Sequence, residues 1–568
     1  MMDKNPQRFW HFSSAYNLLD RQPDCEECLA LTLTLTINGQ QYQIPGANVK
    51  VCELSAFRYG FNGKLEFYLP NDQRPDALLS AFVGAELISI DLSIKPVLNL
   101  PSPAPQAFQV KALVSEKALH EQAYRELKGA PVLYRYYRMV FCDPAQFIWQ
   151  QHYPSELYVD TTMASVIKAQ VFSPITLDID FSPADTTLPL VCLALGNADH
   201  ISSQQTGQHN QASFYDFLLT YVSDNNGYFT YDYTKHSYQI SAEEPSLKQS
   251  KAYFPHDIAR IQHYWPPIKR SVTHLLNATA DNQQNIAVPE DLAIDGLKYD
   301  LIMRHTLDAQ FEQHKGRLTT RIQTNGPFLH VHFTQWPLHN CWPECEIQLE
   351  PEVDGQDFLH SNRSYRCHSL FVSLVALEPQ PEQDIDLEFT RYQLNYQAGA
   401  HPTDKPQPHI PQPMMCCYPL YAEGIVVSEQ GEAPEKTYDV PANQDNGQFE
   451  YKIHIPLWDQ IIKVVLEPDY LNSHFYFPFY RNTKLLIAFD LYRAHIVKVL
   501  SWGDGVALPM ATQGNHILFG KTNTDQTSLS HIYQDGKPVL AIKRNKQNDT
   551  ELLQMEEGSI VLQTWEQN

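Results

Sequence analysis

The strongest constraint on the fold is a strict alternation of apolar and polar residues near the start of the chain. Between Leu29 and Gly39 the sequence reads LALTLTLTING, and KLEFYLP repeats the pattern from Lys64 to Pro70. Side chains two residues apart lie on the same face of a strand, so each segment predicts a strand with one buried face. Asn38-Gly39 and Asn62-Gly63 predict tight hairpin turns, because both residue types tolerate positive φ.

The composition also favours β structure. Aromatic residues make up 12% of the chain, with 31 Tyr and 27 Phe, and these side chains suit pleated, half-buried sheet surfaces. A chain of 568 residues exceeds the usual size of one domain, so we predict three or more compact units.

One segment departs from the strand pattern. In SFYDFLLTYVSDNNGYFTYDY, from Ser213 to Tyr233, apolar side chains first recur at helical spacing, and an aromatic run follows Asn226-Gly227. This order predicts a helix, a turn and a strand. Residues from about Leu247 to Glu378 look like further sheet.

A proline-rich segment, AGAHPTDKPQPHIPQP from Ala398 to Pro413, predicts a linker, because its five prolines favour extended backbone. Five strands are predicted beyond it, around YAEGIVVS, GQFEYKIHIPL, QIIKVVLE, KLLIAFD and HIVKVLSW. Their number and spacing suit a small OB-like barrel. The tail after Gln513 contains three further predicted strands, HILFGKT, KPVLAIKR and SIVLQTW.

The charge balance argues against nucleic acid as a partner. The chain has 42 basic and 65 acidic residues and a formal net charge of −23, which repels phosphate backbones and anionic lipid headgroups. The N-terminal sequence MMDKNPQRFWHF lacks the apolar core of a signal peptide. We therefore expect synthesis in the cytoplasm and, if the protein is exported, a route that uses no cleavable signal.

Several cysteines and histidines are candidate metal ligands. Cys25 and Cys28 have a spacing that can hold zinc, and His330 and His332 share a predicted strand face. A richer group of soft ligands comprises His339, Cys341, Cys345, Cys367 and His368. The alternative is that the cysteines are small buried hydrophobic residues and that the histidines are structural. We predict no metal and no cofactor, and we expect adjacent Cys416 and Cys417 to be reduced.

No local signature of an enzyme is present in the sequence. It has no GxSxG elbow, no HExxH and no glycine-rich phosphate loop, so we predict no catalytic residues. The aromatic clusters LYRYYRMVF and HFYFPFY are either platforms for carbohydrate or parts of a sheet core and subunit interface, and we favour the second interpretation. Alternation in the first cluster places Tyr134, Tyr136 and Arg138 on one face of a strand, with Arg135 and Tyr137 on the other.

The order of these segments resembles the VgrG family of type VI secretion spikes and the related hubs of contractile phage tails. The segment from Ser213 resembles the family's helix and Gly-aromatic hairpin, FTRYQLNYQAGAHPTDKPQPHIPQP resembles the exit from hub to barrel, and GNHILFGKTN with SIVLQTW resembles the start of the needle. The sequence differs from the family in three places. DNGQFEY stands where a Tyr-Gly-Arg step is usual, LWDQIIKVVLEPDY replaces the Trp-rich strand that normally follows, and the tail lacks a sustained valine-rich repeat.

The resemblance implies a mainly β fold with minor α: phage-hub-like β-barrel domains, then an OB-like barrel and a short β-needle stub. The expected parts are a first hub β-barrel domain (1–105), a hub segment with the helix and hairpin (106–246), a second hub β domain (247–397), the linker (398–413), the barrel (414–510) and the needle stub (511–568).

The function implied by the resemblance is mechanical rather than catalytic. It implies a homotrimer that sits on an Hcp-like tube, contacts baseplate proteins, carries a PAAR-like tip protein or an effector, and crosses the target membrane when it is fired. The short tail implies a short needle, or one completed by another protein. For the trimer interface we select Ile517, Phe519, Ile560 and Leu562, because a short strand pair is not stable alone.

Two other functions stay open. A carbohydrate-binding or adhesive β protein would use its Tyr and Phe clusters to stack on sugars, and an effector enzyme would use a dispersed catalytic set.

Overall fold

The chain forms two compact units, each of which draws on separate stretches of sequence. The first unit comprises residues 1–153, 164–186 and 212–415, and the second comprises 154–163, 187–211 and 416–568. The computed structural model describes residues 25–71, 76–97, 107–124, 132–196, 212–247, 250–253, 258–265, 270–278, 284–288, 292–303, 308–323, 327–337, 339–349, 363–404, 410–411, 413–414, 416–431, 437–443, 449–465, 479–501, 514–522 and 524–566.

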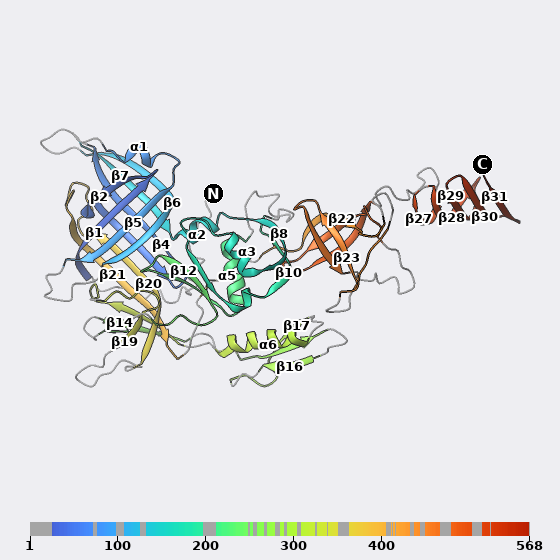
Figure 1. Cartoon of the computed structure of the whole chain (residues 1–568). Helices are drawn as coiled ribbons and strands as arrows, with labels where there is room; N and C mark the ends of the chain where they lie inside the picture. The colour runs from blue at the N-terminus through green and yellow to red at the C-terminus, as the bar shows by residue number, and fades with distance from the viewer. Residues whose placement is uncertain are drawn as a thin grey trace. The chain divides into compact units, whose positions relative to one another are not determined.

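The first unit is built on one large sheet whose middle closes into a barrel (Figure 1). The strand order is β13-β19-β20-β3-β4-β7-β6-β5-β1-β21-β18-β14, with β2 beside β1. Because β20 also pairs with β21, the strands from β20 through β3 and β1 to β21 form a closed antiparallel ring. Closure gives the strands of the ring hydrogen-bonded neighbours on both sides.

The strands of this sheet are β1 Cys25–Ile37, β2 Gln40–Ile44, β3 Val49–Phe57, β4 Gly60–Asn71, β5 Ile88–Pro96, β6 Phe108–Tyr124, β7 Val132–Cys142, β13 Ser250–Tyr253, β14 Ile258–Tyr264, β18 Phe328–Phe333, β19 Glu346–Leu349, β20 Ser364–Ala376 and β21 Phe389–Pro402. The ring therefore extends beyond the predicted domain 1–105, and it includes strands from the predicted domain 247–397.

The alternation that opens the sequence forms the core of this barrel. In β1, Leu29, Leu33 and Leu35 are 0% exposed, whereas Thr32 is exposed and Thr34 is half-buried. The turn predicted at Asn38-Gly39 is confirmed, because both residues have positive φ, 49° and 77°, and connect β1 to β2. This alternation therefore fixes which face of the first hairpin is buried.

The turn predicted at Asn62-Gly63 is wrong. Both residues lie inside β4, and the chain reverses at Arg58 and Tyr59, between the paired residues Phe57 and Gly60. Gly63 serves close packing instead, because a Cβ at this position would lie 2.4 Å from the Phe141 ring and 2.4 Å from a backbone oxygen. A glycine in an alternating segment therefore marked a close approach and not a turn.

The predicted helix, turn and strand after Ser213 are confirmed. Helix α5, Phe214–Asp224, begins at a capping box in which the Ser213 hydroxyl and the Asp216 carboxylate each accept from the other residue's backbone N–H. Asn226 at φ 54° ends the turn. Strands β11, Tyr228–Asp232, and β12, Ser237–Ser241, follow, and β12 pairs in parallel with β9, Leu177–Asp180.

Short helices complete the first unit: α1 Leu79–Phe82, α2 Pro144–Trp149 and α3 Met163–Ala169, the last of which begins in the second unit. Within the described parts of the chain, no helix is long and apolar enough to cross a membrane.

A small inserted layer lies in the region where we predicted only sheet. Strands β15 Val272–Asn277, β16 Gln284–Val288 and β17 Lys298–Met303 form a separate sheet, and helix α6, Asp308–Gln323, packs on one face of it. Leu275 and Phe311 are 0% exposed and form its core. Few other apolar residues lie at helical spacing in this polar segment, so the pattern did not predict α6.

A buried network of charges lies beside the turn between β3 and β4. The Arg58 side chain is 0% exposed; its Nε donates to Glu344, and its Nη1 donates to Glu244 at 2.9 Å. Arg366 donates to Glu344 as well, and its Nε lies 3.3 Å from Glu244. Two arginines therefore balance two glutamates inside the first unit, and Arg58 also lies over the Tyr228 ring at 5.3 Å.

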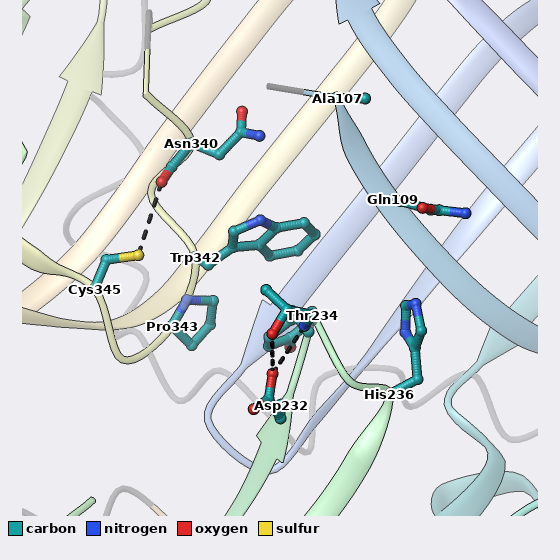
Figure 2. A pocket seen from close by; sticks show the side chains of 10 residues that line it. Ala107, Gln109, Asp232, Thr234, His236, Asn340, Trp342, Pro343 and Cys345 are labelled. Atoms are coloured by element: carbon teal, nitrogen blue, oxygen red, sulfur yellow. Dashed lines mark hydrogen bonds between the residues drawn. The ribbon is translucent and has the colours of Figure 1, made fainter. Parts of the chain in front are cut away.

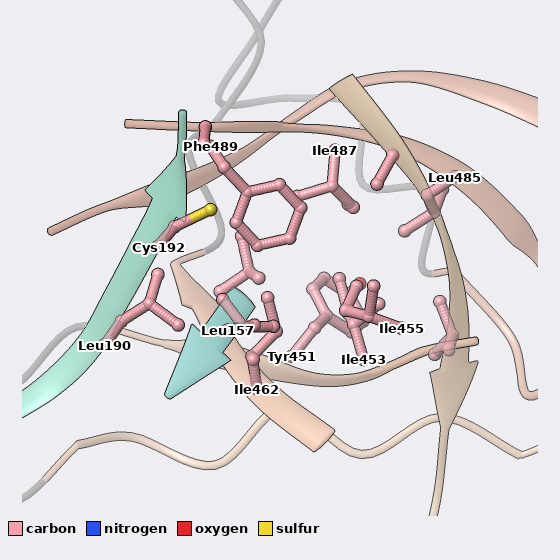
Figure 3. Close-up of a cluster of buried hydrophobic side chains, with 14 residues drawn as sticks. Leu157, Leu190, Cys192, Tyr451, Ile453, Ile455, Ile462, Leu485, Ile487 and Phe489 are labelled. Atoms are coloured by element: carbon pink, nitrogen blue, oxygen red, sulfur yellow. The ribbon is translucent and has the colours of Figure 1, made fainter. Parts of the chain in front are cut away.

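The second unit contains the five strands predicted after the linker: β22 Leu420–Val427, β23 Glu450–Ile455, β24 Gln460–Val465, β25 Lys484–Phe489 and β26 Ala494–Ser501. Their order in the sheet is β24-β23-β22-β25-β26, and the outer strands β24 and β26 approach each other. Alternate side chains such as Ile453, Ile455 and Ile487 are 0% exposed and fill the interior (Figure 3).

Two strands from a distant part of the sequence complete this interior. β8, Ser155–Thr162, pairs with β10, Thr187–Ala194, and we name this pair the β8–β10 ribbon. Leu157, Leu190 and Cys192 point from the ribbon into the same cluster as Phe489 (Figure 3). Sequence reasoning placed these residues in the hub segment 106–246 and did not connect them with the barrel.

The predicted linker begins later than expected. Ala398 to Pro402 continue β21 and are buried between β18 and β20. These residues contain a proline only at their end, so nothing in AGAH interrupts the strand. The two units divide between Met415 and Cys416, close to the predicted start of the barrel at residue 414.

We predict that Glu344→Gln lowers the stability of the folded chain by about 3–5 kcal/mol, because it leaves Arg58 and Arg366 buried with one anion too few. The matched control is Glu557→Gln, which removes the partner of Lys537 at 2.7 Å in a pair whose side chains are 70% and 65% exposed. An exposed pair contributes about 0–1 kcal/mol. Urea unfolding followed by tryptophan fluorescence measures both variants, and equal shifts in the two would contradict the prediction.

Candidate functional site

The C-terminal sheet is the strongest candidate for a functional surface. Its strands are β27 Gly514–Thr522, β28 Asp525–Gln534, β29 Lys537–Lys546, β30 Asp549–Glu556 and β31 Ser559–Trp565, paired in chain order. The three strands predicted in this tail are confirmed. β28 and β30 were missed, because DQTSLSHIYQ and DTELLQME hold few apolar residues and show alternation only weakly.

Tight turns fold the tail into this meander. Asp535 and Gly536, at φ 52° and 77°, connect β28 to β29, and Gly558 at φ 73° connects β30 to β31. Positive φ at such positions matches the twist of antiparallel strands. The turns fix the register, and the register determines which side chains share a face.

The register places a continuous apolar row on one face of the sheet. Directly paired residues lie on the same face, and an apolar row crosses all five strands: Ile517, Leu529, Ile542, Leu553 and Leu562. A second row on the same face ends in Leu540, Met555 and Ile560. We name this face the apolar tail face.

The four residues selected from the sequence as trimer contacts all lie on the apolar tail face. Ile517 and Phe519 are each 45% exposed, Ile560 is 70% exposed and Leu562 is 79% exposed. The opposite face holds more polar side chains, as in the row Leu518, Ser528, Lys543, Leu552 and Gln563. It also holds Val539 and Ala541, which are 3% and 8% exposed. No second layer of the described chain packs on this five-stranded sheet.

An uncovered apolar face on a single sheet is a site of association. A sheet needs a second layer to bury its apolar side chains, and contiguous exposed apolar surface marks a protein contact. The arrangement of the tail can therefore bind another sheet.

The cysteine pair Cys25 and Cys28 does not face one point. Both lie in β1, where residues three apart point to opposite faces, and Cys25 is buried whereas Cys28 is half-buried. Cys341, Cys345 and Cys367 are buried in the first unit, and the Cys367 thiol donates to the Cys341 carbonyl at 3.3 Å. Burial raises the pKa of the Cys367 thiol well above its ordinary value, which favours the neutral thiol.

The other proposed ligands of this group, His339 and His368, do not complete a site with these cysteines: among the described residues no three His, Cys, Asp or Glu side chains are placed to hold a metal ion. Cys416 and Cys417 are both half-buried, and neither forms a disulfide.

The histidines of β18 belong to a buried row in the first unit. Burial lowers the pKa of His330 to about 4, and its ring lies 4.8 Å from that of Tyr264. His332 lies 3.4 Å from the Arg260 guanidinium. Across the sheet, the His368 and His401 rings stack at 5.8 Å, and burial lowers the pKa of both. His330, His368 and His401 are therefore neutral structural groups near neutral pH.

One charged group joins this row to the buried network of arginines. Glu244 lies 3.5 Å from His401 Nε2. Burial opposes ionisation of Glu244, but the hydrogen bond with His401 and the charges of Arg58 and Arg366 outweigh it, and its pKa lies below its ordinary value. Glu244 is therefore ionised and paired, as a structural carboxylate is.

The aromatic cluster of β7 is part of the barrel. Tyr137 is 0% exposed and stacks on Phe67 at 5.0 Å. On the other strand face, Tyr136 donates to Glu66, which pairs with Arg138 across the strands. The predicted division of this cluster between two faces is confirmed. Residues 471–478, which hold most of the second aromatic cluster, lie outside the described residues.

A cleft of about 540 Å³ lies beside the β11–β12 hairpin (Figure 2). Its walls include Gln109, Asp232, His236, Asn340 and Trp342. The Trp342 indole stacks on Phe108 at 3.8 Å and on Tyr233 at 4.5 Å. Because both faces of the indole are covered, Trp342 offers only its edge to the cleft and cannot stack on a sugar ring.

Comparisons with known proteins find similarity in structure and none in sequence. No family model and no curated protein matches the chain. The structure of the half-lidded Francisella PdpA–VgrG complex matches with a TM-score of 0.68 and 13% identity, over 94% of this chain and 88% of that chain.

Two further structures of PdpA–VgrG complexes match equally well. The lidless complex matches with a TM-score of 0.69 and 13% identity, over 95% of this chain and 99% of that chain. The lidded Francisella complex matches with a TM-score of 0.68 and 13% identity, over 96% and 81%. At this identity the similarity concerns the fold. The predicted class, mainly β with minor α, is confirmed.

The buried histidines predict a loss of stability in acid. The pKa of His330 falls from 6.5 to about 4 on folding, so below pH 6.5 the unfolded chain binds a proton that the folded chain does not. Above pH 6.5 His330 is neutral in both states and does not lower the free energy of unfolding. Below pH 6.5 the free energy of unfolding falls, by up to about 1.4 kcal/mol per pH unit. Burial also lowers the pKa of His368 and His401, so these residues lower the free energy of unfolding in acid as well.

His330→Gln should therefore make unfolding less steeply dependent on pH between 6.5 and about 4. Urea midpoints measured at intervals across this range give the slope. His120→Gln, at an exposed position of β6, is the matched control. A His330→Gln slope equal to that of the unmodified chain would refute the assignment.

Proposed function

We propose that this protein is a structural hub and spike component of a contractile injection apparatus and that it performs no catalysis. The apolar tail face carries the proposal, because it requires a partner sheet and belongs to a chain that shares its fold with structures of a PdpA–VgrG complex. A phage tail baseplate hub is the same proposal in a related machine. The role is mechanical: a rigid β assembly is driven through a target membrane by energy supplied from outside the chain.

The assembly we propose is a homotrimer. Three copies related by rotation turn their apolar tail faces toward a common axis, and each sheet then buries Ile542 and its neighbours against the other two. Large apolar interfaces of this kind give obligate, slowly dissociating oligomers. The resemblance to spike proteins selects three copies among the closed arrangements.

The partners we propose follow from this assembly. An Hcp-like tube protein and baseplate proteins contact the hub, and a PAAR-like tip protein or an effector sits beyond the needle. The meander of the tail, β27 to β31, forms the base of the proposed needle. The similar complexes each contain two proteins, PdpA and VgrG. The protein is made in the cytoplasm and leaves the cell by firing.

The competing function, binding of carbohydrate by aromatic platforms, is less well supported. It needs an open aromatic face, but Tyr137 and Trp342 each have neighbouring rings stacked on them. It also predicts a monomer, so the oligomeric state separates the two proposals.

We predict that the purified chain has a mass of three times 65.2 kDa. Light scattering coupled to size-exclusion chromatography measures the mass directly. A monomer that persists at micromolar concentration after addition of an Hcp-like tube protein and a PAAR-like tip protein would rule out the trimeric spike and bring carbohydrate binding forward.

We predict that the double variant Ile560→Asp, Leu562→Asp weakens the trimer by at least about tenfold in its dissociation constant, because it buries unpaired carboxylates in the interface. The matched control is Val561→Asp, Gln563→Asp, which introduces the same charges on the same strand but on the opposite face. Mass measured over a dilution series compares the two. Equal dissociation of both variants would show that the apolar tail face is not the interface.

A further inference from the structure

The two units are connected by more than the proline-rich segment. Going along the chain, the sequence passes between the units at five places, after Tyr153, Met163, Thr186, Gln211 and Met415. The first four passages enter or leave the two stretches that hold the β8–β10 ribbon, and only the last follows the proline-rich segment.

We propose that the β8–β10 ribbon is a clasp that ties the second unit, with its C-terminal sheet, to the first unit independently of the proline-rich segment. The ribbon is continuous in sequence with the first unit on both sides. Its apolar side chains belong to the interior of the barrel in the second unit. A force between the units is therefore divided among several backbone connections.

Packing anchors the ribbon in the second unit. Leu157 is 7% exposed, Leu190 is 6% exposed and Cys192 is 0% exposed, all in one cluster with Tyr451 and Phe489. Burial of each leucine removes apolar surface from water and so stabilises the ribbon in the barrel. Withdrawal of the ribbon would expose these side chains and open the interior of the barrel to water.

Hydrogen bonds hold the ribbon at both strands. The Trp458 indole N–H donates to the Ser155 carbonyl at 2.9 Å, and the Tyr418 hydroxyl donates to the Cys192 carbonyl at 2.8 Å. The Cys192 backbone N–H donates to the Leu491 carbonyl at 2.9 Å. The contacts come from segments before β22, between β23 and β24, and between β25 and β26, so the ribbon is part of the barrel fold and not a surface addition.

A clasp has a mechanical consequence. A single proline-rich connection acts as a semi-rigid spacer between two bodies. Several backbone connections in parallel share a force that acts between the units. The role of the clasp in transmitting the thrust of a spike rests on the proposed function, whereas the clasp itself rests only on the fold.

The test cuts the proline-rich segment and leaves the ribbon intact. A recognition site for a specific protease is inserted between Lys405 and Pro406 of the full chain, and cleavage is verified on a denaturing gel. We expect both fragments to elute together from a size-exclusion column under native conditions. Separation of the fragments would overturn the proposal.

Matched variants show whether the ribbon is responsible. Leu190→Asp places a carboxylate in the barrel interior, and Thr187→Asp places the same group at an exposed position of the same strand. After cleavage, the Leu190→Asp fragments should associate at least about tenfold more weakly than the Thr187→Asp fragments. Leu190→Ala, which adds no charge, serves if the aspartate variant does not fold. Fragments that stay equally associated in all variants would refute the clasp.

The mass of the uncut protein keeps the two proposals separate. Co-elution of the fragments reports on the clasp whatever the number of copies in the particle. If the uncut protein is a monomer and its fragments co-elute, the trimer is refuted and the clasp is supported. If the uncut protein is a trimer and its fragments separate, the clasp is refuted and the trimer is supported.

Discussion

The closure of the barrel by β1, β21 and β20 is the constraint on which the rest of the first unit depends. β1 begins the described chain and β21 lies near residue 400, yet they pair from Cys25 opposite Leu394 to Ala30 opposite Phe389. β20 then pairs with both β21 and β3. The ring hydrogen-bonds its strands on both sides, and the curvature that it imposes directs alternate side chains inward.

Closure also brings together groups that no local pattern connects. Arg58 lies in a turn after β3, Arg366 in β20 and His401 in β21, and the ring places all three around Glu244 and Glu344. Removing such charges from water is unfavourable unless each finds its partners. The network therefore depends on correct closure, and it gives the turn between β3 and β4 a single arrangement.

The C-terminal sheet presents the opposite case. Its strands have neighbours only in the plane of the sheet, and the described chain supplies no second layer. The same alternation that buries Leu33 in the barrel leaves Leu562 79% exposed. The apolar tail face thus has the alternation of a buried strand face but no layer that covers it. This difference between the two parts of the chain is the basis for our proposal that the tail takes part in assembly.

Local pattern by itself determined much of the protein. Alternation located the strands of the first hairpin, the five strands β22 to β26 and three of the five tail strands, and helical spacing located α5. The same reasoning placed Ile517, Phe519, Ile560 and Leu562 among contact residues, and the register shows that they share one face. These features depend on neighbours in sequence, which a pattern records directly.

Only the tertiary structure decided the features that depend on distant pairing. The sequence did not reveal that β20 and β21 close the first barrel, that the β8–β10 ribbon completes the second one, or that Gly63 lies beneath Phe141. The prediction from sequence also missed α6, because this helix is mostly polar and has few apolar residues at helical spacing. The physical reason is that strand pairing and close packing join residues up to hundreds of positions apart, and the pattern of one segment does not identify its partner in space.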